Sequence, residues 1–394
     1  VDISYFILIK VIPILIFCLL SACLFGQDNN QSLTDEELRE MIFGEGFTPQ
    51  IKDEIKPNQT WIPSYSGKNG IGYSDNPLYG PFIREDAAYY DSSLEAFFLR
   101  DGNPEQFTYA YLFGEGKLFE ELPEHESTLI LLGQFEHAYT PENSSQTYGI
   151  RLRHTYYDQG FDFSDLGLPY SMQIRSHKSE CIPYLSQRFS ELLTATIELA
   201  KGQENFKEVT DDNKEQGVTF SIKGSPNVVD WKLESEIINK EYKERPKRNW
   251  DGSLMSNDSL ETRKVMISIE LEKDFENIIV SYSKAKFFWS CLKDNAGGYY
   301  DYDKVGMKLE HNFDLDPYNL DLEIGGAKTT YDLRRLVSGE RFERESFTCS
   351  ALFQRPLGDK LDAYFKWSRE EDFSNLRDYE YYTNSWSAGI SWEL

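Results

Sequence analysis

Cysteine is scarce in this sequence, and its few cysteines are poorly spaced for the sites that cysteine builds. The 394 residues include five Cys, too few for a disulfide scaffold at this length. No Cys-x-x-Cys pair occurs, which excludes a zinc ribbon. Cys18 and Cys23 fall in an N-terminal segment that we expect to be removed or lipidated. Cys181, Cys291 and Cys349 remain, and a disulfide between Cys181 and Cys291 stays open at this point.

Positive charge is also in short supply. There are 41 Lys+Arg against 66 Asp+Glu, a formal net charge of −25. Such a protein lacks the basic surface that holds a phosphate backbone, so we expect no nucleic-acid partner. Aromatic residues, in contrast, make up 15% of the chain, which argues against disorder. These observations indicate a large, acidic, exported protein rich in Tyr and Phe.

The N-terminal residues indicate export. Lys10 precedes an apolar run from residue 11 to 20, which is followed by small residues and then by the polar sequence QDNNQS. This pattern predicts a signal peptide over residues 1–26 in preference to a retained membrane anchor. The sequence Leu20-Ser21-Ala22-Cys23 resembles the lipobox of bacterial lipoproteins, which would make Cys23 the lipidated N-terminus. Cleavage near Gly26 without lipidation is the alternative.

Residues 27–106 differ in composition from the remainder. A short capped helix is predicted over residues 32–41. Closely spaced Pro and Gly residues follow, and they argue against long regular elements. We therefore predict a periplasmic N-terminal or plug-like segment over 27–106, within which residues 94–99 form either a strand or a helical turn.

From Phe107 to the C-terminus, apolar and polar side chains alternate. In residues 264–272, for example, Val265, Ile267, Ile269 and Leu271 alternate with polar or charged neighbours. A period of two over such lengths predicts strands with one apolar face and one polar face. About fourteen strands fit into residues 107–394, and the count rises to about sixteen if the segment around Leu94 and one more segment join the sheet.

The predicted connections alternate in length. Short turns lie near residues 140–144, 224–227, 274–277, 314–319 and 356–359, and longer polar loops near 159–169, 202–214, 246–259, 292–300, 334–341 and 371–384. Short periplasmic turns and longer outer loops are typical of membrane barrels. In lipid every backbone polar group needs a partner within the protein, so the sheet must close on itself. We predict an all-β, transmembrane, antiparallel up-and-down β-barrel over 107–394.

The last predicted strand carries a more specific signal. One of its faces is apolar and consists of Trp386, Ala388, Ile390, Trp392 and Leu394. This strand resembles the C-terminal β-signal of Gram-negative outer-membrane proteins, with Leu394 where Phe is commoner. The resemblance identifies a class of protein and no particular family. It implies the cell outer membrane as location, with a periplasmic N-terminal segment. It also implies two kinds of partner, namely outer-membrane lipid including lipopolysaccharide, and the barrel-assembly machinery that reads the signal.

The polar faces of the predicted strands carry charges of both signs. The candidate lumen-lining residues are Arg151, Arg153, Glu198, Lys232, Glu234, Glu270, Lys304, Lys308, Glu310, Asp362 and Lys366. They either line a water-filled pore and bias which solutes pass, or pair with one another and plug a narrow lumen. We predict a porin-like channel for passive passage of small solutes, and the acidic excess favours cations or neutral solutes. An export, assembly or surface-attachment barrel without an open pore is the alternative, and an outer-membrane enzyme is the third.

Histidine gives little support to an enzyme. His137, His154 and His311 share the apolar faces of predicted strands and lie beside aromatic residues near the strand ends. Amphipathic rings of this kind are typical of the girdle at the membrane–water interface. His125 and His177 lie in or near predicted loops without an adjacent nucleophile. We expect no catalytic residue, no metal site and no cofactor.

Overall fold

A computed structural model describes residues 61–80, 85–100, 105–120, 127–162, 171–207, 211–226, 228–275, 280–336, 338–376 and 380–394. These ranges contain sixteen strands. The strands are β1 (Trp61–Ser74), β2 (Ala87–Arg100), β3 (Gln106–Phe119), β4 (Ser127–Tyr139), β5 (Gln146–Asp162), β6 (Ser171–Ser190), β7 (Leu193–Phe206), β8 (Asn213–Gly224), β9 (Asp230–Arg248), β10 (Leu254–Asp274), β11 (Val280–Asp294), β12 (Tyr302–Asp314), β13 (Asn319–Arg335), β14 (Arg341–Gly358), β15 (Leu361–Ser374) and β16 (Tyr381–Glu393). None of the residues in these ranges forms a helix that is long and apolar enough to cross a membrane.

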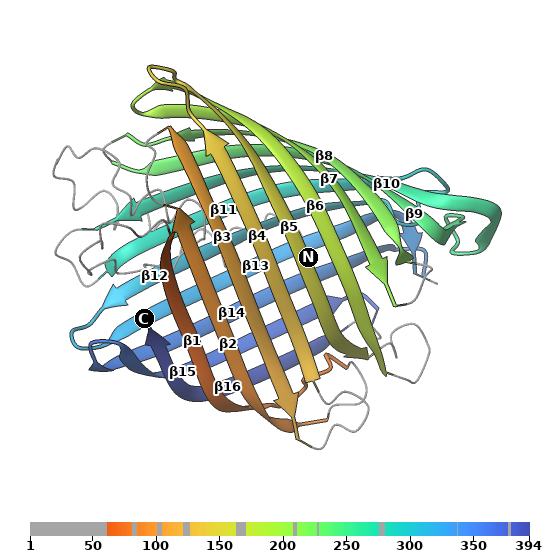
Figure 1. The fold of residues 1–394 in the computed structure, drawn as a ribbon. Helices are drawn as coiled ribbons and strands as arrows, with labels where there is room; N and C mark the ends of the chain where they lie inside the picture. The colour runs from red at the N-terminus through yellow and green to blue at the C-terminus, as the bar shows by residue number, and fades with distance from the viewer. Residues whose placement is uncertain are drawn as a thin grey trace. The chain divides into compact units, whose positions relative to one another are not determined.

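The strands form one closed antiparallel barrel (Figure 1). Each strand lies beside its neighbours in the chain, and β1 pairs with β16 to complete the ring. Two further backbone bonds extend this seam. The Leu394 N–H donates to the Tyr65 carbonyl oxygen at 2.8 Å, and the Tyr65 N–H donates to the Leu394 carbonyl oxygen at 3.1 Å. Closure removes the exposed edges that an open sheet would present.

Two ends of the barrel are distinguished by their connections. One end, here called the turn end, carries residues 140–145, 191–192, 315–318 and 359–360, the start of β1 and the end of β16. The opposite end, the loop end, carries the connections that follow β1, β3 and each later odd-numbered strand. The short turns predicted from the sequence lie at the turn end.

The alternation of the sequence is the reason for this architecture. On β10 and β11, Ile269 lies opposite Phe287, while the adjacent Glu270 lies opposite Lys286. Side chains of like polarity therefore share a face along every pair of strands that alternates in this way. The predicted all-β, antiparallel up-and-down barrel is confirmed, with sixteen strands. Fourteen of these, β3 to β16, follow residue 105, and β2 contains the segment around Leu94.

The predicted start of the barrel at Phe107 was wrong, because the barrel begins at Trp61. The Gly and Pro residues of 61–74 do not interrupt the strand. A Cβ atom at Gly70 would lie 2.6 Å from Asp91 Oδ1 and 2.9 Å from the Ala388 carbonyl oxygen. Gly70 therefore allows close approach of neighbouring strands and does not mark a turn. The predicted signal peptide, Cys23, the helix over 32–41 and residues 27–60 lie outside the described residues.

Several predicted loops are shorter than expected. The predicted loop over 246–259 is largely strand, because β9 continues to Arg248 and β10 begins at Leu254. β5 likewise continues to Asp162. These strand ends carry polar residues on both faces, so the alternation that identifies a strand from sequence disappears before the strand itself ends.

Replacement of Gly389 by Ala should reduce the yield of closed barrel. Gly389 lies opposite Gly70 at the β1–β16 seam. A Cβ atom there would lie 2.6 Å from Gly70 Cα, so backbone would have to move. The folded fraction after refolding in detergent is measured from the difference in gel mobility between unheated and boiled samples. Gly326→Ala is the matched control, because its Cβ would find only the Ser346 carbonyl oxygen, at 3.5 Å. Equal yields for both variants would contradict the prediction.

Candidate functional site: the inner wall

Contacts that pass over an intervening strand identify the inner face of the barrel. Arg151 on β5 lies 3.6 Å from Glu198 on β7. The Tyr184 hydroxyl on β6 donates to a Glu136 oxygen on β4 at 2.6 Å. Side chains two strands apart converge on the concave side of a curved sheet and diverge on its convex side. We call the face that bears these residues the inner wall, and the opposite face the outer wall.

The candidate lumen-lining residues all lie on the inner wall. The register of paired residues around the ring assigns each of them to the face that bears Glu136 and Tyr184. On β5, for example, Arg151 lies opposite Glu136 and Arg153 opposite Gln134. Their role in lining a pore stays a prediction.

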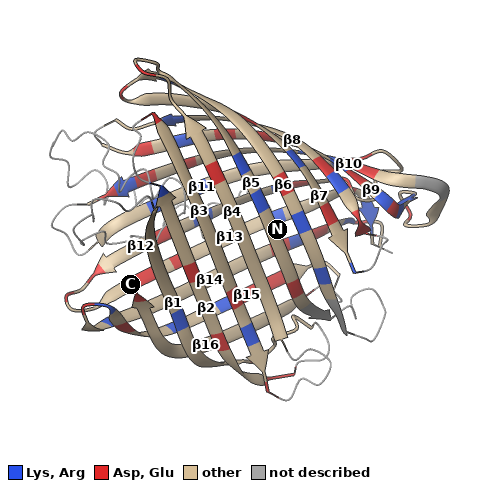
Figure 2. Cartoon of the chain, viewed as in Figure 1, with Lys and Arg blue, Asp and Glu red and all other residues tan. Residues whose placement is uncertain are grey.

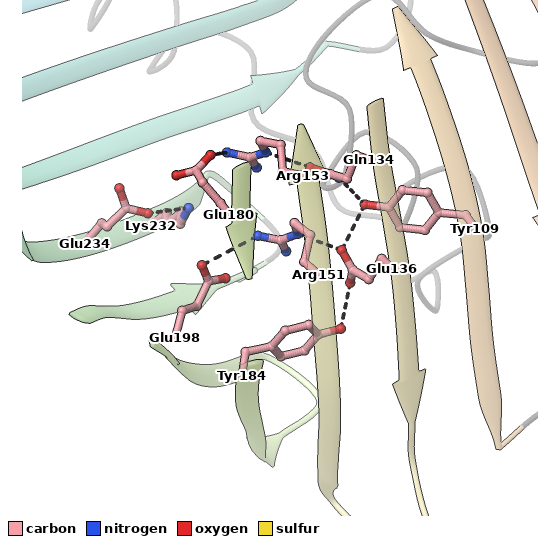
Figure 3. Close-up of polar contacts among 10 residues, drawn as sticks. All are labelled: Tyr109, Gln134, Glu136, Arg151, Arg153, Glu180, Tyr184, Glu198, Lys232 and Glu234. Carbon is pink, nitrogen blue, oxygen red and sulfur yellow. Dashed lines mark hydrogen bonds and ion pairs between the residues drawn. The ribbon is translucent and has the colours of Figure 1, made fainter. Parts of the chain in front are cut away.

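Glu136 is a carboxylate of this wall with several side-chain partners (Figure 3). It accepts a hydrogen bond from Arg151 Nε at 2.8 Å, from the Tyr109 hydroxyl at 2.9 Å and from the Tyr184 hydroxyl at 2.6 Å. Glu136 is 4% exposed. A buried carboxylate is tolerated only when its charge is paired and its oxygens are hydrogen-bonded, and both conditions are met here.

A second chain of contacts runs beside the first. Arg153 Nε donates to Gln134 Oε1 at 3.0 Å, and a guanidinium nitrogen of Arg153 lies 3.8 Å from Glu180. Lys178 lies 3.1 Å from the same Glu180 and also pairs with Glu215. Figure 3 shows the contacts that join β3 to β7 along the inner wall, and the ion pair between Lys178 and Glu215 extends them to β8.

The opposite half of the inner wall is built in the same way. Lys284 lies 3.2 Å from Glu270, and Lys308 lies 3.1 Å from Glu323. Positive and negative positions lie beside one another on neighbouring strands (Figure 2). The side chains of Lys308 and Glu323 are nevertheless 42% and 43% exposed. Part of the charged wall is therefore open to solvent.

Sequence reasoning missed several members of this network. Glu136 and Gln134 share the polar face of β4, a signal that was present in the sequence. Tyr109 and Tyr184 carry no such signal, because a tyrosine on a strand is as common on the outer wall. Only the register, which sets Tyr109 opposite Glu136, brings these groups together.

Three carboxylates gather at the turn end of the inner wall. Asp314, Asp316 and Asp362 line a pocket of about 390 Å³ together with Asn312 and Gln354. Within the part of the chain that the structure describes, none of the three carboxylates has a Lys or Arg at ion-pair distance. This mouth of the barrel therefore carries negative charge that the wall does not neutralise.

The start of the connection that follows β1 is held against β16 at the loop end. Asn76 is 0% exposed, and its amide nitrogen donates to the Gly80 carbonyl oxygen at 3.0 Å and to that of Tyr382 at 3.1 Å. This clamp brings the Tyr79 ring edge-on to Tyr381, with ring centroids 5.4 Å apart.

Tyr79 also lies close to strands on both sides of the barrel seam. Burial raises the pKa of Tyr79, and the nearby Glu370 carboxylate and the Tyr157 and Tyr89 phenols raise it further. These groups belong to the inner faces of β15, β5 and β2. Nothing in the sequence around Tyr79 indicated this position.

The predicted girdle histidines lie on the outer wall. His137 Nδ1 lies 2.8 Å from Thr108 Oγ1, and His311 Nδ1 lies 2.8 Å from Ser283 Oγ. The predicted strand-end position of His154 was wrong, because the long β5 places it in mid-strand. His177, predicted near a loop, lies on β6 with its ring 5.8 Å from that of His154.

The β-signal residues and the cysteines also face outward. Trp386, Ala388, Ile390 and Trp392 lie on the outer wall of β16, and their role as an assembly signal stays a prediction. Cys181, Cys291 and Cys349 are free thiols, so the disulfide left open above is absent among them. In the described ranges, no group of three or more His, Cys, Asp or Glu is arranged to hold a metal ion.

Comparison with known proteins adds a likeness of fold. No protein-family model matches the chain, and no curated protein sequence matches it. Among solved structures, the chain is similar to OccAB1 of Acinetobacter baumannii, with 8% identity, a TM-score of 0.46, and coverage of 85% of this chain and 96% of that one. It is also similar to CdiB of the same organism (10% identity, TM-score 0.44, 84% and 60% covered). A loop-deletion mutant of OmpT, an outer membrane protein of Vibrio cholerae, is similar as well, with 7% identity, a TM-score of 0.44, and coverage of 85% of this chain and 100% of that one.

Replacement of Glu136 by Gln should destabilise the barrel. The change leaves the Arg151 guanidinium with only Glu198, at 3.6 Å. Loss of one partner of a buried ion pair costs about 3 kcal/mol, so the urea concentration at the unfolding midpoint should fall. Glu198→Gln is the matched control, because the Glu198 side chain is 26% exposed and Arg151 keeps its closer bond to Glu136. If Glu198→Gln lowered the urea midpoint more than Glu136→Gln, Glu136 would not be the more important partner of Arg151.

Proposed function

We propose that this chain is an outer-membrane barrel that forms a porin-like channel for passive passage of small solutes. The observation that carries the proposal is a closed sixteen-stranded barrel whose inner wall is charged with both signs and partly open to solvent. Barrels of this strand number leave an aqueous channel, whereas eight-stranded barrels are filled by side chains.

The outer wall supports placement in a membrane. Large apolar side chains are exposed on it, including Ile71 at 72%, Leu112 at 54% and Ile390 at 45%. In such a closed barrel the backbone hydrogen bonds are made within the protein, and the apolar side chains of the outer wall face the acyl chains of the lipid. In water the same surface would drive aggregation.

The orientation follows from the connections. Short turns face the periplasm in barrels of this kind, so we assign the turn end to the periplasm, together with the N-terminal segment that precedes β1. Lipid, lipopolysaccharide and the barrel-assembly machinery are the partners that this placement implies. The β-signal residues are suited to the last of these, because β16 forms the closing seam with β1.

The distribution of charge favours cations over anions. Ion pairs neutralise only part of the inner wall, because in the described ranges Lys304 and Lys366 have no carboxylate within ion-pair distance. The carboxylates of Asp314, Asp316 and Asp362 gather in one pocket at the turn end, also without an ion-pair partner among the described residues. Uncompensated carboxylates at a pore mouth attract cations and repel anions.

An export or attachment barrel without an open pore is the second candidate. The position of Tyr79 favours it, because this ring packs edge-on against that of Tyr381 at the loop end of β16. The two candidates differ in whether ions flow through the purified barrel.

Purified full-length protein should produce stepwise currents in a planar lipid bilayer. The current steps should be uniform in size, because each corresponds to insertion of one barrel of fixed bore. Protein boiled before addition is the control and should give none. A folded preparation that inserts into the bilayer without conducting would overturn the channel proposal and favour the second candidate.

Replacing Asp314, Asp316 and Asp362 together by Asn should weaken cation preference. In a potassium chloride gradient, the reversal potential should move toward zero, because three negative charges are lost from the mouth. Glu343→Gln is the control, since this carboxylate pairs with Lys328 on the outer wall. An unchanged reversal potential in the triple variant would show that these carboxylates do not face the ion path.

A further inference from the structure

A polar groove lies on the outside of the barrel near the loop end. Its volume is about 420 Å³, and it crosses β8 to β11. The side chains of Lys214, Gln216, Asn239, Arg263 and Lys293 line it from the outer wall. The inner-wall network described above does not include these five residues.

The groove begins where the apolar band of the outer wall ends. Gln216 is two residues beyond the exposed Val218 on β8, and Arg263 is two residues beyond Val265 on β10. Residues two apart on a strand share a face. The groove therefore lies at the height at which acyl chains give way to headgroups in the proposed membrane placement.

Three cations of this region lie outside ion-pair distance of any described carboxylate, although the register sets Lys214 opposite Glu241. Lys214 and Arg263 are exposed, as is Lys201, which lies opposite Gln216 on β7. Across the described ranges, no carboxylate lies within ion-pair distance of any of these three. Lys293 differs, since Asp301 and Asp332 already neutralise it.

Three other cations at the loop end of the outer wall are paired. Arg175 lies 3.0 Å from Asp158, and Lys328 lies 2.8 Å from Glu343. Arg369 pairs with Glu371. Lys201, Lys214 and Arg263 thus differ from these paired cations, and they lie together on β7, β8 and β10. Three carboxylates also line the groove. Glu241 lies opposite Lys214 on β8, Glu261 shares the outer face of β10 with Arg263, and Asp294 belongs to the inner wall of β11.

We infer that the groove binds the phosphate-bearing headgroup of a lipid in the outer leaflet. A guanidinium such as that of Arg263 binds phosphate oxygens with two parallel hydrogen bonds, and lysines add positive charge. The acyl chains would then lie along Val218 and Val265, directly below the groove. The inference rests on the membrane placement of the proposed function and is independent of whether the barrel conducts.

The experiment measures lipid adducts of the detergent-solubilised full chain by native mass spectrometry. The probes are a bisphosphorylated lipid A, the same lipid without phosphates, and inorganic phosphate as competitor. The variant Lys201→Gln/Lys214→Gln/Arg263→Gln should bind the bisphosphorylated lipid roughly tenfold more weakly, because it loses charge-assisted hydrogen bonds. The control variant Arg175→Gln/Lys328→Gln/Arg369→Gln loses the same charge from paired positions and should bind as the unaltered chain does.

Four outcomes would overturn the inference. These are unchanged binding by the groove variant, an equal loss in the control variant, equal binding of the lipid without phosphates, and displacement of the lipid by low-millimolar inorganic phosphate. Folding of both variants is checked by gel mobility. Bilayer currents of the groove variant should match those of the unaltered chain, since the groove lies outside the barrel. If neither the groove variant nor the unaltered chain gave currents while the unaltered chain still bound the lipid, the channel proposal would fail and the lipid site would stand.

Discussion

The pairing of β1 with β16 is the interaction on which the rest of the structure depends. Without it, both strands would leave a row of backbone N–H and carbonyl groups unpaired, at a cost of several kcal/mol for each group in lipid. The seam is tight, since Gly70 and Gly389 lie directly opposite each other with no room for a side chain at either position. Closure also creates the distinction between an inner and an outer wall, which an open sheet of the same strands would lack.

Given closure, the polar face has to satisfy its charges within a confined space. Neighbouring strands do this by setting opposite charges side by side, and Glu136 shows how far the pairing goes, with one guanidinium and two phenols on a single carboxylate. Such pairing neutralises part of the wall. The selectivity of the barrel should therefore depend on the groups that remain unpaired, which include the carboxylates of the turn end and lysines such as Lys304 and Lys366, more than on the net charge of −25.

The sequence was sufficient to predict most of the strands, but it did not predict which side chains meet across neighbouring strands. Alternation is local, so the strand containing Ile267 and Ile269 could be recognised without knowledge of its neighbours. β1 was not recognised because its inner face is mostly Ser and Gly, and small residues allow the close contact across the seam. The bond between Tyr109 and Glu136 depends on the register between β3 and β4, and the position of Tyr79 depends on the clamp made by Asn76. Register and loop conformation are set by the whole ring, so no single segment reveals them.

The outer wall carries exposed charge above its apolar band. At the loop end, Lys201, Lys214 and Arg263 lie outside ion-pair distance of any described carboxylate. A strongly acidic chain gains nothing for solubility from leaving three cations exposed at the edge of an apolar band. Pairing was available to the fold at this height, as Arg175 and Lys328 show. Cations without a partner in the protein are therefore best explained by a partner outside it, and at the headgroup level of an outer membrane the abundant anion is the phosphate of a lipid.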